Sequence, residues 1–559
     1  MSKVFVLGLD GATWDMLRPL LDQGLMPRLA RLMERGASGR LQSVFPPLSP
    51  VAWTGVMTGK NSGKHGVFEF LESNQNPLGG RVNSSRSIDA ELVWEIAGRH
   101  GKTCIAGGVP MSYPARPAPG FYLGDFLSPA NAPDFASDPA FFGEMERALG
   151  RPYRPWATVV HDGGHEVEVL ADLTDFLQNH LDAIRFLMDR RPWDLFMFDL
   201  MATDRIQHEL WHVWDLSHSA AKGRDLAKVR EGFLKFWTRL DDGIGAIEDA
   251  LPPDTTFLLM SDHGFGGVEW FVNFNVWLLE RGAIALQDSF YVRQKAFCHR
   301  LGVTPEWFYG VMAKLGLAGQ RVGRFRGKQD GPIERLAQSV FLSRRHIDWS
   351  RTKAYAQGNF GQIFLNLKGR QPQGCVEPAD ARGVLDDLKA GLFELKNPES
   401  GEPLVERVLE RDDLYEGPHA NLAPDLTVVL RDWNYRTIGL HDFTTHKVIS
   451  PAFGPTGDHR MEGAIIAAGA GIQPGASPQG ATLLDLAPTI LRLMGIPVPA
   501  DMDGRVLHEL LDPAVIAVPA ADVAPPAATP HSAMPLAGVA YTDEEDAAIQ
   551  QRLADLGYL

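Results

Sequence analysis

Two Asp/His pairs give the chain its clearest chemical signal. Asp204 and His208 are four residues apart, so on a helix both side chains project from one face and can share a metal ion. Asp262 and His263 are adjacent and follow an apolar run, which places them in a turn after a strand. Oxygen and nitrogen ligands without thiolate suit zinc or manganese in a catalytic site. Each pair alone is also compatible with a helix cap or an ordinary loop histidine, but together with Asp10, after the first apolar run, the pairs favour a metal site.

A serine precedes a proline in the segment 45–54. Ser49 followed by Pro50 predicts a helix N-cap with proline at the first helical position. A hydroxyl at a helix N-terminus that also binds a metal is an activated nucleophile beside a natural phosphate site. Ser43 and Thr54 are competing hydroxyls, and Thr54 would lie more than one turn inside the helix.

The segments around these residues alternate between strand and helix patterns. Apolar runs at 4–9, 194–204 and 255–264 end in polar turns, as expected of strands buried on both faces of a largely parallel sheet. Helical patterns at 26–35 and 225–251 lie between them, which predicts an α/β fold with helices flanking the sheet. Because ligands of such folds bind at the carboxyl ends of strands, the polar turns fall where a site is expected.

The chain divides into a core, an insertion and a tail. The segments are a first part of the catalytic core (1–277), an inserted, mainly helical cap (278–344), a second part of the core (345–512), an Ala/Pro-rich linker (513–540) and a C-terminal helix (541–559). The second part of the core carries strand patterns and a late helix, at 353–367, 426–430, 463–468 and 482–494. Thr542 and Glu545 fit a capping box for the last helix. Because the linker has few core-forming residues, we expect the core to stay folded without residues 513 onward.

Composition excludes several classes of protein. The 559 residues include 69 acidic and 54 basic ones, and the net charge of −15 argues against a general nucleic-acid binder. Three cysteines without a CxxC pair are too few for a disulfide scaffold and favour a reducing compartment. The first apolar run is too short for a signal peptide, and no run approaches the roughly 18 apolar residues of a membrane span. We therefore expect a cytoplasmic protein that neither spans a membrane nor binds nucleic acid.

In chain order, these residues are similar to the motifs of a known family. The motifs are Asp10, Ser49 before Thr58-Gly59 and His65-Gly66, Asp204 with His208, Asp262-His263, and Gly457-Asp458-His459. The chain resembles the alkaline phosphatase superfamily, in its type I phosphodiesterase and nucleotide pyrophosphatase branch, and within that branch the bacterial predicted phosphohydrolase/phosphomutase group. The resemblance spans about 1–275 and 345–510 and implies an alkaline-phosphatase-like core.

The resemblance also implies two divalent metal ions, with zinc as the first expectation and manganese as the alternative. The implied ligand sets are Asp204, His208 and His459 for one ion, and Asp10, Ser49, Asp262 and His263 for the other. Ser49 would be the nucleophile. Two metals lower the pKa of such a hydroxyl and clamp the attacking and leaving oxygens of an in-line displacement.

Departures from related patterns bear on the substrate. Sulfatases carry an arginine where this chain has Trp53, which argues against a sulfatase. Nucleotide pyrophosphatases carry an asparagine soon after the His-Gly pair, but here residues 67–70 contain no amide, so Lys60 and Asn61 become the candidate phosphate contacts. Asp458, beside a predicted ligand, is a candidate supporting residue. The cap offers further cations: Arg321, Arg324, Arg326, Arg344 and Arg345.

The expected activity is therefore hydrolysis of a small phosphodiester or phosphomonoester through a phosphoserine intermediate on Ser49. One alternative is a phosphomutase of the metal-dependent phosphoglycerate mutase type, in which the cap would trap a small phosphorylated acid. The other is a non-catalytic binding protein on the same fold. The C-terminal helix could dock a partner or a second copy of the chain.

Overall fold

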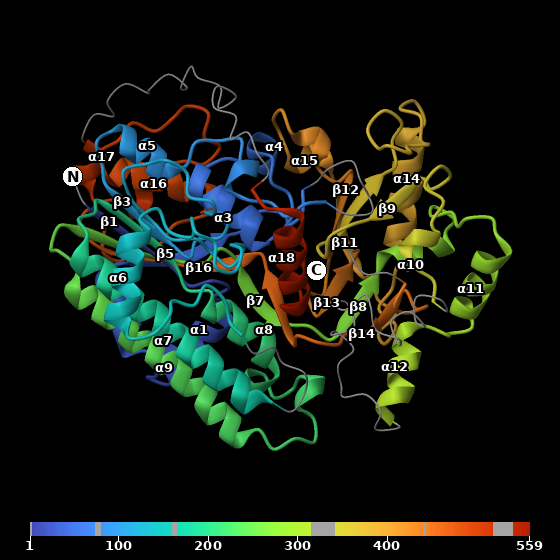
Figure 1. Ribbon diagram of the computed structural model, residues 1–559, viewed down its shortest axis with the longest axis horizontal. Coiled ribbons are helices and arrows are strands. Elements are labelled where there is room, and N and C mark those ends of the chain that lie inside the picture. The colour runs from blue at the N-terminus through green and yellow to red at the C-terminus, as the bar shows by residue number, and fades with distance from the viewer. Residues whose placement is uncertain are drawn as a thin grey trace.

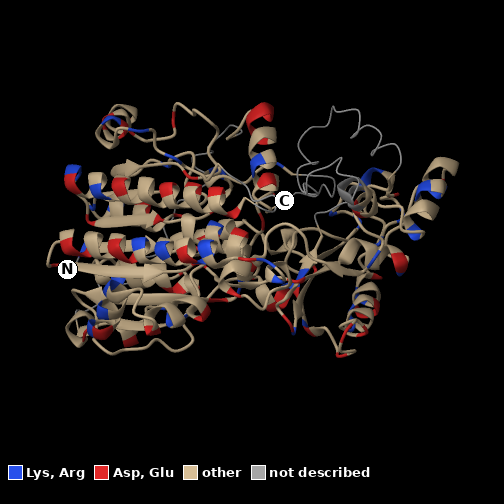
Figure 2. Ribbon diagram, turned by 90° about the horizontal axis from the view of Figure 1, so that it is seen from below, with Lys and Arg blue, Asp and Glu red and all other residues tan. Residues whose placement is uncertain are grey.

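The computed structural model describes residues 3–72, 80–158, 165–314, 341–439, 443–517 and 540–558. Most of the predicted linker, and Arg321, Arg324 and Arg326 of the predicted cap, lie outside these residues. Figure 1 shows a large sheet with helices on both faces and, beside it, a smaller group of strands and helices. Acidic and basic residues are interspersed along the outer helices (Figure 2).

A seven-stranded sheet forms the centre of the larger part. Its order is β2 (Ala37–Gln42), β16 (Glu462–Gly469), β6 (Thr255–Met260), β1 (Lys3–Gly8), β5 (Leu195–Asp199), β3 (Cys104–Gly107) and β4 (Gly120–Tyr122). The strands from β6 to β4 run parallel, whereas β16 is antiparallel to both of its neighbours. This largely parallel sheet confirms the predicted α/β class.

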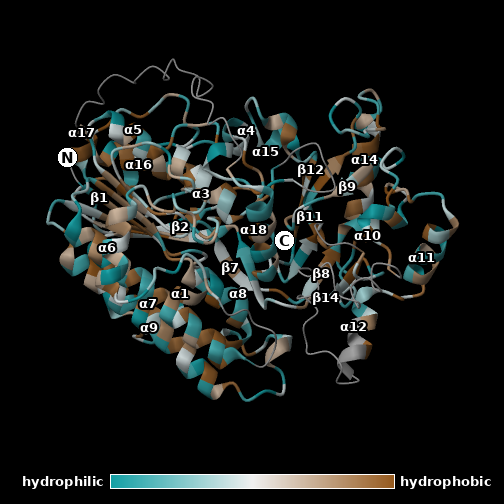
Figure 3. Ribbon diagram, viewed as in Figure 1, coloured by the Kyte–Doolittle hydropathy of each residue, from teal (hydrophilic) through white to brown (hydrophobic). Residues whose placement is uncertain are grey.

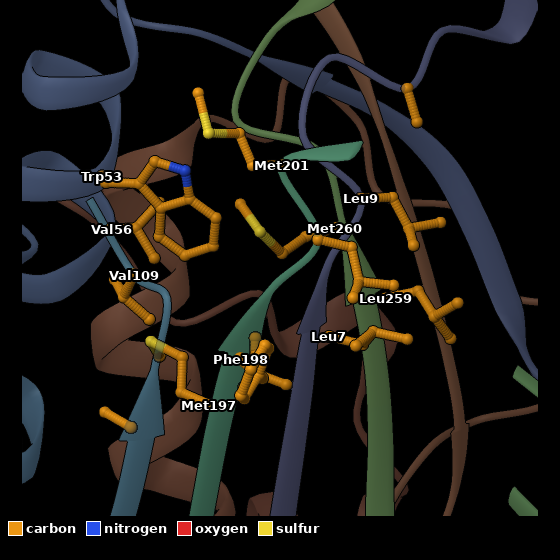
Figure 4. Close-up of a cluster of buried hydrophobic side chains, with 14 of the residues drawn as sticks. Leu7, Leu9, Trp53, Val56, Val109, Met197, Phe198, Met201, Leu259 and Met260 are labelled. Atoms are coloured by element: carbon orange, nitrogen blue, oxygen red, sulfur yellow. The ribbon is translucent and has the colours of Figure 1, made fainter. Parts of the chain in front are cut away.

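The central strands lie between two layers of helices because their side chains are apolar on both faces. Every residue of β5 and β6 is buried. One layer contains α1 (Trp14–Asp22), α2 (Pro27–Arg35), α6 (Pro139–Leu149), α7 (Glu166–Arg190), α8 (Ala202–Trp214) and α9 (Ala227–Ala250), and the other contains α3 (Ser49–Thr58), α5 (Val93–Arg99) and α16 (Leu486–Leu493). In Figure 3 these strands are mostly hydrophobic, while the helices alternate in character. Trp53 of α3 lies over the ends of the central strands, close to Met201 and Met260 (Figure 4).

The strand patterns at 353–367 and 426–430 form a separate sheet. Its order is β11 (Val405–Glu410), β12 (Leu426–Leu430), β10 (Gln362–Leu365) and β9 (Ala354–Ala356), and its pairs are antiparallel. It packs with α10 (Phe274–Glu280) and α14 (Ala381–Phe393) around its own hydrophobic cluster, which includes Leu392 and Leu426. Of the three strand patterns predicted in the second part of the core, the one at 463–468 joins the central sheet, as β16.

Two small sheets connect these parts. The first has the order β13 (Tyr435–Ile438), β8 (Trp270–Asn273) and β14 (Ile449–Pro451). The second pairs β7 (Gly264–Gly267) with β15 (Gly457–Arg460), with His459 opposite Phe265. Because β7 directly follows His263, this pairing brings two histidines that are far apart in sequence close together.

Apart from the C-terminal helix, the other α-helices in the described residues are short. They are α4 (Ser62–His65), α11 (Phe290–Arg300), α12 (Pro305–Lys314), α15 (Arg411–Leu414) and α17 (Pro513–Ala517). Helices α11 and α12 belong to the predicted cap, whose boundaries stay a prediction. Among the described helices, none combines the length and apolar character that a membrane crossing requires.

The C-terminal helix α18 (Asp543–Asp555) packs onto the core. It begins with the predicted capping box, in which the Thr542 hydroxyl accepts from the Glu545 N–H and the Glu545 carboxylate accepts from the Thr542 N–H. Ile549 and Leu553 are fully buried in the main hydrophobic cluster. Removing the chain from 513 onward would expose the core surface that α18 covers, a cost that the expectation of a core folded without this segment did not include.

We expect Leu553→Ala to lower the free energy of unfolding by about 2–5 kcal/mol, because it leaves a cavity between α18 and the core. Glu544→Ala, at an exposed position of the same helix, should change it by less than about 0.5 kcal/mol. Chemical denaturation of the full chain measures both. Equally small effects would contradict the packing of α18 on the core.

Candidate functional site

The carboxyl ends of three neighbouring strands carry the candidate site. Their polar residues are Asp10 after β1, Asp199 at the end of β5, and Asp262 with His263 after β6. Helix α8 follows β5 closely, and its Thr203 hydroxyl donates to the Asp10 carbonyl oxygen (2.7 Å). This bond ties the first turn of α8 to the turn after β1, at the sheet edge where ligands of α/β folds bind.

Asp204 and His208 of α8 meet His459 of β15. Nε2 of His208 and Nε2 of His459 lie 3.3 and 3.2 Å from Oδ1 of Asp204, and 2.9 Å from each other. All three side chains are buried. Burial alone raises the pKa of Asp204, but the two rings outweigh it and hold this pKa well below its usual range. The three residues predicted for one ion therefore converge.

Asp10, Asp262 and His263 form the second group. Nε2 of His263 lies 3.4 Å from Oδ1 of Asp10 and 3.4 Å from Oδ2 of Asp262. The Gly11 N–H donates to Oδ1 of Asp262 (3.2 Å) and fixes that carboxylate. The ring of His263 stacks on that of His459 with centroids 3.6 Å apart, so the two groups are adjacent.

The three histidine rings are oriented by the backbone. Each places Nδ1 against a carbonyl oxygen: His208 against Gly457 (2.8 Å), His459 against Pro47 (2.7 Å) and His263 against Gly264 (3.1 Å). A ring that donates from Nδ1 keeps the lone pair of Nε2, and here each Nε2 faces the carboxylates. Histidines that bind metal through Nε2 are held in this way.

Several buried carboxylate oxygens accept no hydrogen bond. Within the described part of the chain, no hydrogen bond reaches one oxygen each of Asp10, Asp204 and Asp262, or either oxygen of Asp199. Burial, followed by repulsion from Asp262, raises the pKa of Asp10 and of Asp199 well above its usual range, and burial raises the pKa of Asp262 to about 6. Uncompensated buried charge is costly. Divalent cations would offset it, and a set of carboxylate oxygens and imidazole nitrogens fits them.

Asp199 is a residue of this cluster that sequence reasoning did not single out. It pairs with Gly8 in the register of β1 and β5. A Cβ on Gly8 would lie 2.6 Å from Oδ1 of Asp199 and 2.6 Å from the Trp53 ring, so glycine is needed for this close approach. The available signal was an aspartate at the end of a fully buried strand, next to the turn that carries Asp10.

Ser49 is 1% exposed and is the first residue of α3. The predicted N-cap at Ser49 is wrong by one residue, because Leu48 has the extended cap conformation and Ser49 is already helical. Pro50 fits the second position because N–H groups of the first turn have no partner within the helix. The bond between His459 and the Pro47 carbonyl ties the turn before Ser49 to the metal-site candidates. The role of Ser49 as nucleophile and ligand stays a prediction.

The competing hydroxyls already have backbone partners. The Thr54 hydroxyl donates to the Pro50 carbonyl oxygen one turn earlier (2.5 Å), and the Ser43 hydroxyl donates to the Asp262 carbonyl oxygen (2.7 Å). Ser43 therefore supports the turn that holds Asp262.

The predicted phosphate contacts interact with a late loop. Nζ of Lys60 lies 2.5 Å from Oδ2 of Asp501, and the Asn61 amide donates to Oδ2 of Asp503 (2.8 Å). Asp501 and Asp503 do not belong to the Asp/His cluster of the candidate site. A phosphate-binding role for Lys60 and Asn61 stays a prediction.

Asp458 lies beside His459 on β15 and is buried. Its Oδ2 lies 2.9 Å from Nε of Arg436, and its Oδ1 accepts from the His459 N–H (2.9 Å). The candidate ligand atoms of His208, Asp458 and His459 lie within 4.8 Å of one another. Asp458 is thus already balanced by an arginine, which suits a supporting role next to His459.

Comparison with solved structures supports the fold. Phosphonoacetate hydrolase from Sinorhizobium meliloti 1021 superposes with a TM-score of 0.51 at 16% identity, covering 87% of this chain and 94% of that one. Human ectonucleotide pyrophosphatase/phosphodiesterase 5 gives 0.48 at 13% identity, covering 91% and 100%. Because the TM-score of the second superposition is lower, we base the fold assignment on the first. A search of curated proteins found no match.

The sequence itself carries the stronger relationship. The profile of the family "Type I phosphodiesterase / nucleotide pyrophosphatase" matches residues 4–442, which include every ligand predicted from the sequence except His459. His459 joins the site through the pairing of β15 with β7. Because the match covers more than half of its length, the chain belongs to the type I phosphodiesterase / nucleotide pyrophosphatase family and is a hydrolase of phosphoric ester bonds.

Proposed function

We propose that this hydrolase uses two divalent cations and a phosphoserine intermediate on Ser49 to hydrolyse small phosphodiesters or phosphomonoesters. Zinc as the native metal, a cytoplasmic location and a partner at the C-terminal helix stay predictions from the sequence. The phosphomutase and binding-protein alternatives have no specific support in the geometry.

The observation that carries the proposal is the arrangement of the ring nitrogens and carboxylate oxygens. Nε2 atoms of three histidines face carboxylate oxygens at 3.2–3.4 Å, while each Nδ1 is directed to a backbone carbonyl. Two such groups, Asp204/His208/His459 and Asp10/Asp262/His263, are stacked against each other. A buried arrangement of acceptors facing acceptors is stable only with cations or protons between them.

Each residue then has a definite task. When bound, the cations would supply positive charge that favours ionisation of a hydroxyl and offsets charge on the phosphoryl oxygens. Ser49, at the start of α3, offers its oxygen at the positive end of a helix dipole, which favours the approach of a phosphate. The phosphoryl group passes to the Ser49 oxygen as the P–O bond to the leaving alcohol breaks, and the proton lost from the serine hydroxyl ends on that alcohol. Water then cleaves the phosphoserine and restores its hydroxyl, releasing phosphate from a monoester or a phosphomonoester from a diester.

We expect Ser49→Ala to bind metal and fold like the wild type but to lose several powers of ten in turnover, each worth about 1.4 kcal/mol of barrier. Ser49→Thr should keep much of the activity because it retains a hydroxyl. Thr54→Ala, which removes a hydroxyl one turn further along the same helix, is the matched control and should change turnover by only a few fold. Hydrolysis of aryl phosphate mono- and diesters measures these rates. Near-wild-type turnover of Ser49→Ala would exclude the covalent step.

We expect chelation to abolish activity, and metal analysis to find two cations per chain. Apparent cation affinity should fall as the pH is lowered through about 6, because the cation must displace protons from Asp262, whose pKa is raised to that value, and from Asp10. Calorimetric titration in buffers of different ionisation enthalpy measures the protons released. Affinity that is constant between pH 5 and 8 would contradict binding at these carboxylates.

We expect a phosphomonoester substrate labelled in its phosphoryl group to release the label as inorganic phosphate. With the same phosphomonoester, a phosphomutase would instead return the phosphoryl group to an organic product, and a binding protein would release nothing. Chromatography of the reaction products distinguishes these results.

A further inference from the structure

The side chain next to the last residue of the chain reaches the candidate metal site. The Tyr558 hydroxyl donates to Oδ2 of Asp204 over 2.6 Å, across 354 positions of sequence. Both side chains are buried. The Tyr558 ring lies edge-on to His208 and His459, with centroids 5.6 and 6.2 Å away. No sequence motif predicted this contact.

The terminal segment is held in place by specific bonds around Tyr558. Arg205, the neighbour of Asp204, donates to the Leu556 carbonyl oxygen (2.9 Å) and lies over the Tyr558 ring (5.6 Å). Arg552 of α18 donates to the carbonyl oxygens of Phe126 and Ser128 (2.6 and 2.8 Å). In Figure 1, α18 and the C-terminus lie between α3 and β7 on one side and the four-stranded sheet of β11, β12, β10 and β9 on the other.

The two oxygens of Asp204 have different partners. Oδ1 faces Nε2 of His208 and of His459, whereas Oδ2 accepts from Tyr558. A carboxylate held in this way directs Oδ1 toward a cation between the histidines, while Oδ2 is engaged by the Tyr558 hydroxyl. Outer partners that fix the orientation of a ligand commonly change metal affinity by about 10–100-fold.

We propose that Tyr558 is a positioning residue of the Asp204/His208/His459 site, so that the C-terminal segment completes the metal centre. This inference rests on the proposed two-metal function. Tyr558 touches the ligand Asp204 rather than the reacting atoms, and its hydrogen bond selects one-oxygen binding by that carboxylate.

The test compares Tyr558→Phe with Tyr541→Phe in the full chain. Phenylalanine at 558 keeps the ring packing and removes only the hydroxyl. Tyr541 belongs to the same terminal segment, but its hydroxyl donates to the Asn83 carbonyl oxygen (3.4 Å), so it serves as the matched control. Zinc affinity of each apoprotein is measured by competition with a chromophoric chelator, and thermal unfolding of the metal-free proteins monitors packing.

Tyr558→Phe should weaken one of the two zinc ions by about 10–100-fold and leave the other unchanged, whereas Tyr541→Phe should bind both like the wild type. Wild-type affinity of Tyr558→Phe would overturn the inference and leave the two-metal proposal intact. Equal weakening by both substitutions would also overturn it, because tail packing alone would then explain the loss. A wild-type protein that binds no zinc, manganese or other divalent cation would instead refute the proposed function, and the inference with it.

Discussion

The concentration of negative charge at one edge of the central sheet is the constraint on which the rest of the structure depends. Asp10, Asp199, Asp204 and Asp262 are almost completely buried there. Burial and mutual repulsion oppose the ionisation of Asp10, Asp199 and Asp262, whose pKa values are raised, whereas His208 and His459 hold the pKa of Asp204 below its usual range. The parallel strands and the core beneath them hold these charges together. Their repulsion lowers the stability of the fold unless cations or protons lie between them.

The backbone, more than the side chains, sets the geometry that receives those cations. Each histidine is aimed by a carbonyl oxygen, and these carbonyls belong to three different segments: the turn before α3, the strand β7 and the strand β15. The β7–β15 pairing is therefore part of the site, since it fixes His459 opposite Phe265. The small sheet of β13, β8 and β14 joins the same arrangement through Arg436 of β13, which is paired with Asp458.

Local sequence patterns predicted the parts of the site that local structure creates. An apolar run followed by a polar turn is sufficient to predict a buried strand and the edge to which it delivers Asp10 or Asp262. Such a pattern does not say which strands pair, so the runs near Ala354 and Leu426 gave no sign that they form a separate sheet. Asp199 was not predicted as a site residue. Its place in the site depends on its position beside Gly8 and Trp53, and that position follows from the register of β1 and β5, which the sequence pattern does not contain.

Prediction from local sequence is also incomplete for the terminal segment. Its capping box predicted the helix, but it contains no information about the surface that the helix covers. In the fold, Tyr558 contacts Asp204 of α8 and the ring of Phe70, and the neighbouring Gly557 carbonyl oxygen accepts from Arg436 (3.4 Å). These partners come from distant parts of the chain, so the segment can dock only where they are already assembled. If Tyr558 orients Asp204, docking of α18 and binding of the cation stabilise each other, since a coupling free energy between two sites is reciprocal. Docking of α18 would then be tighter when the metal centre is occupied.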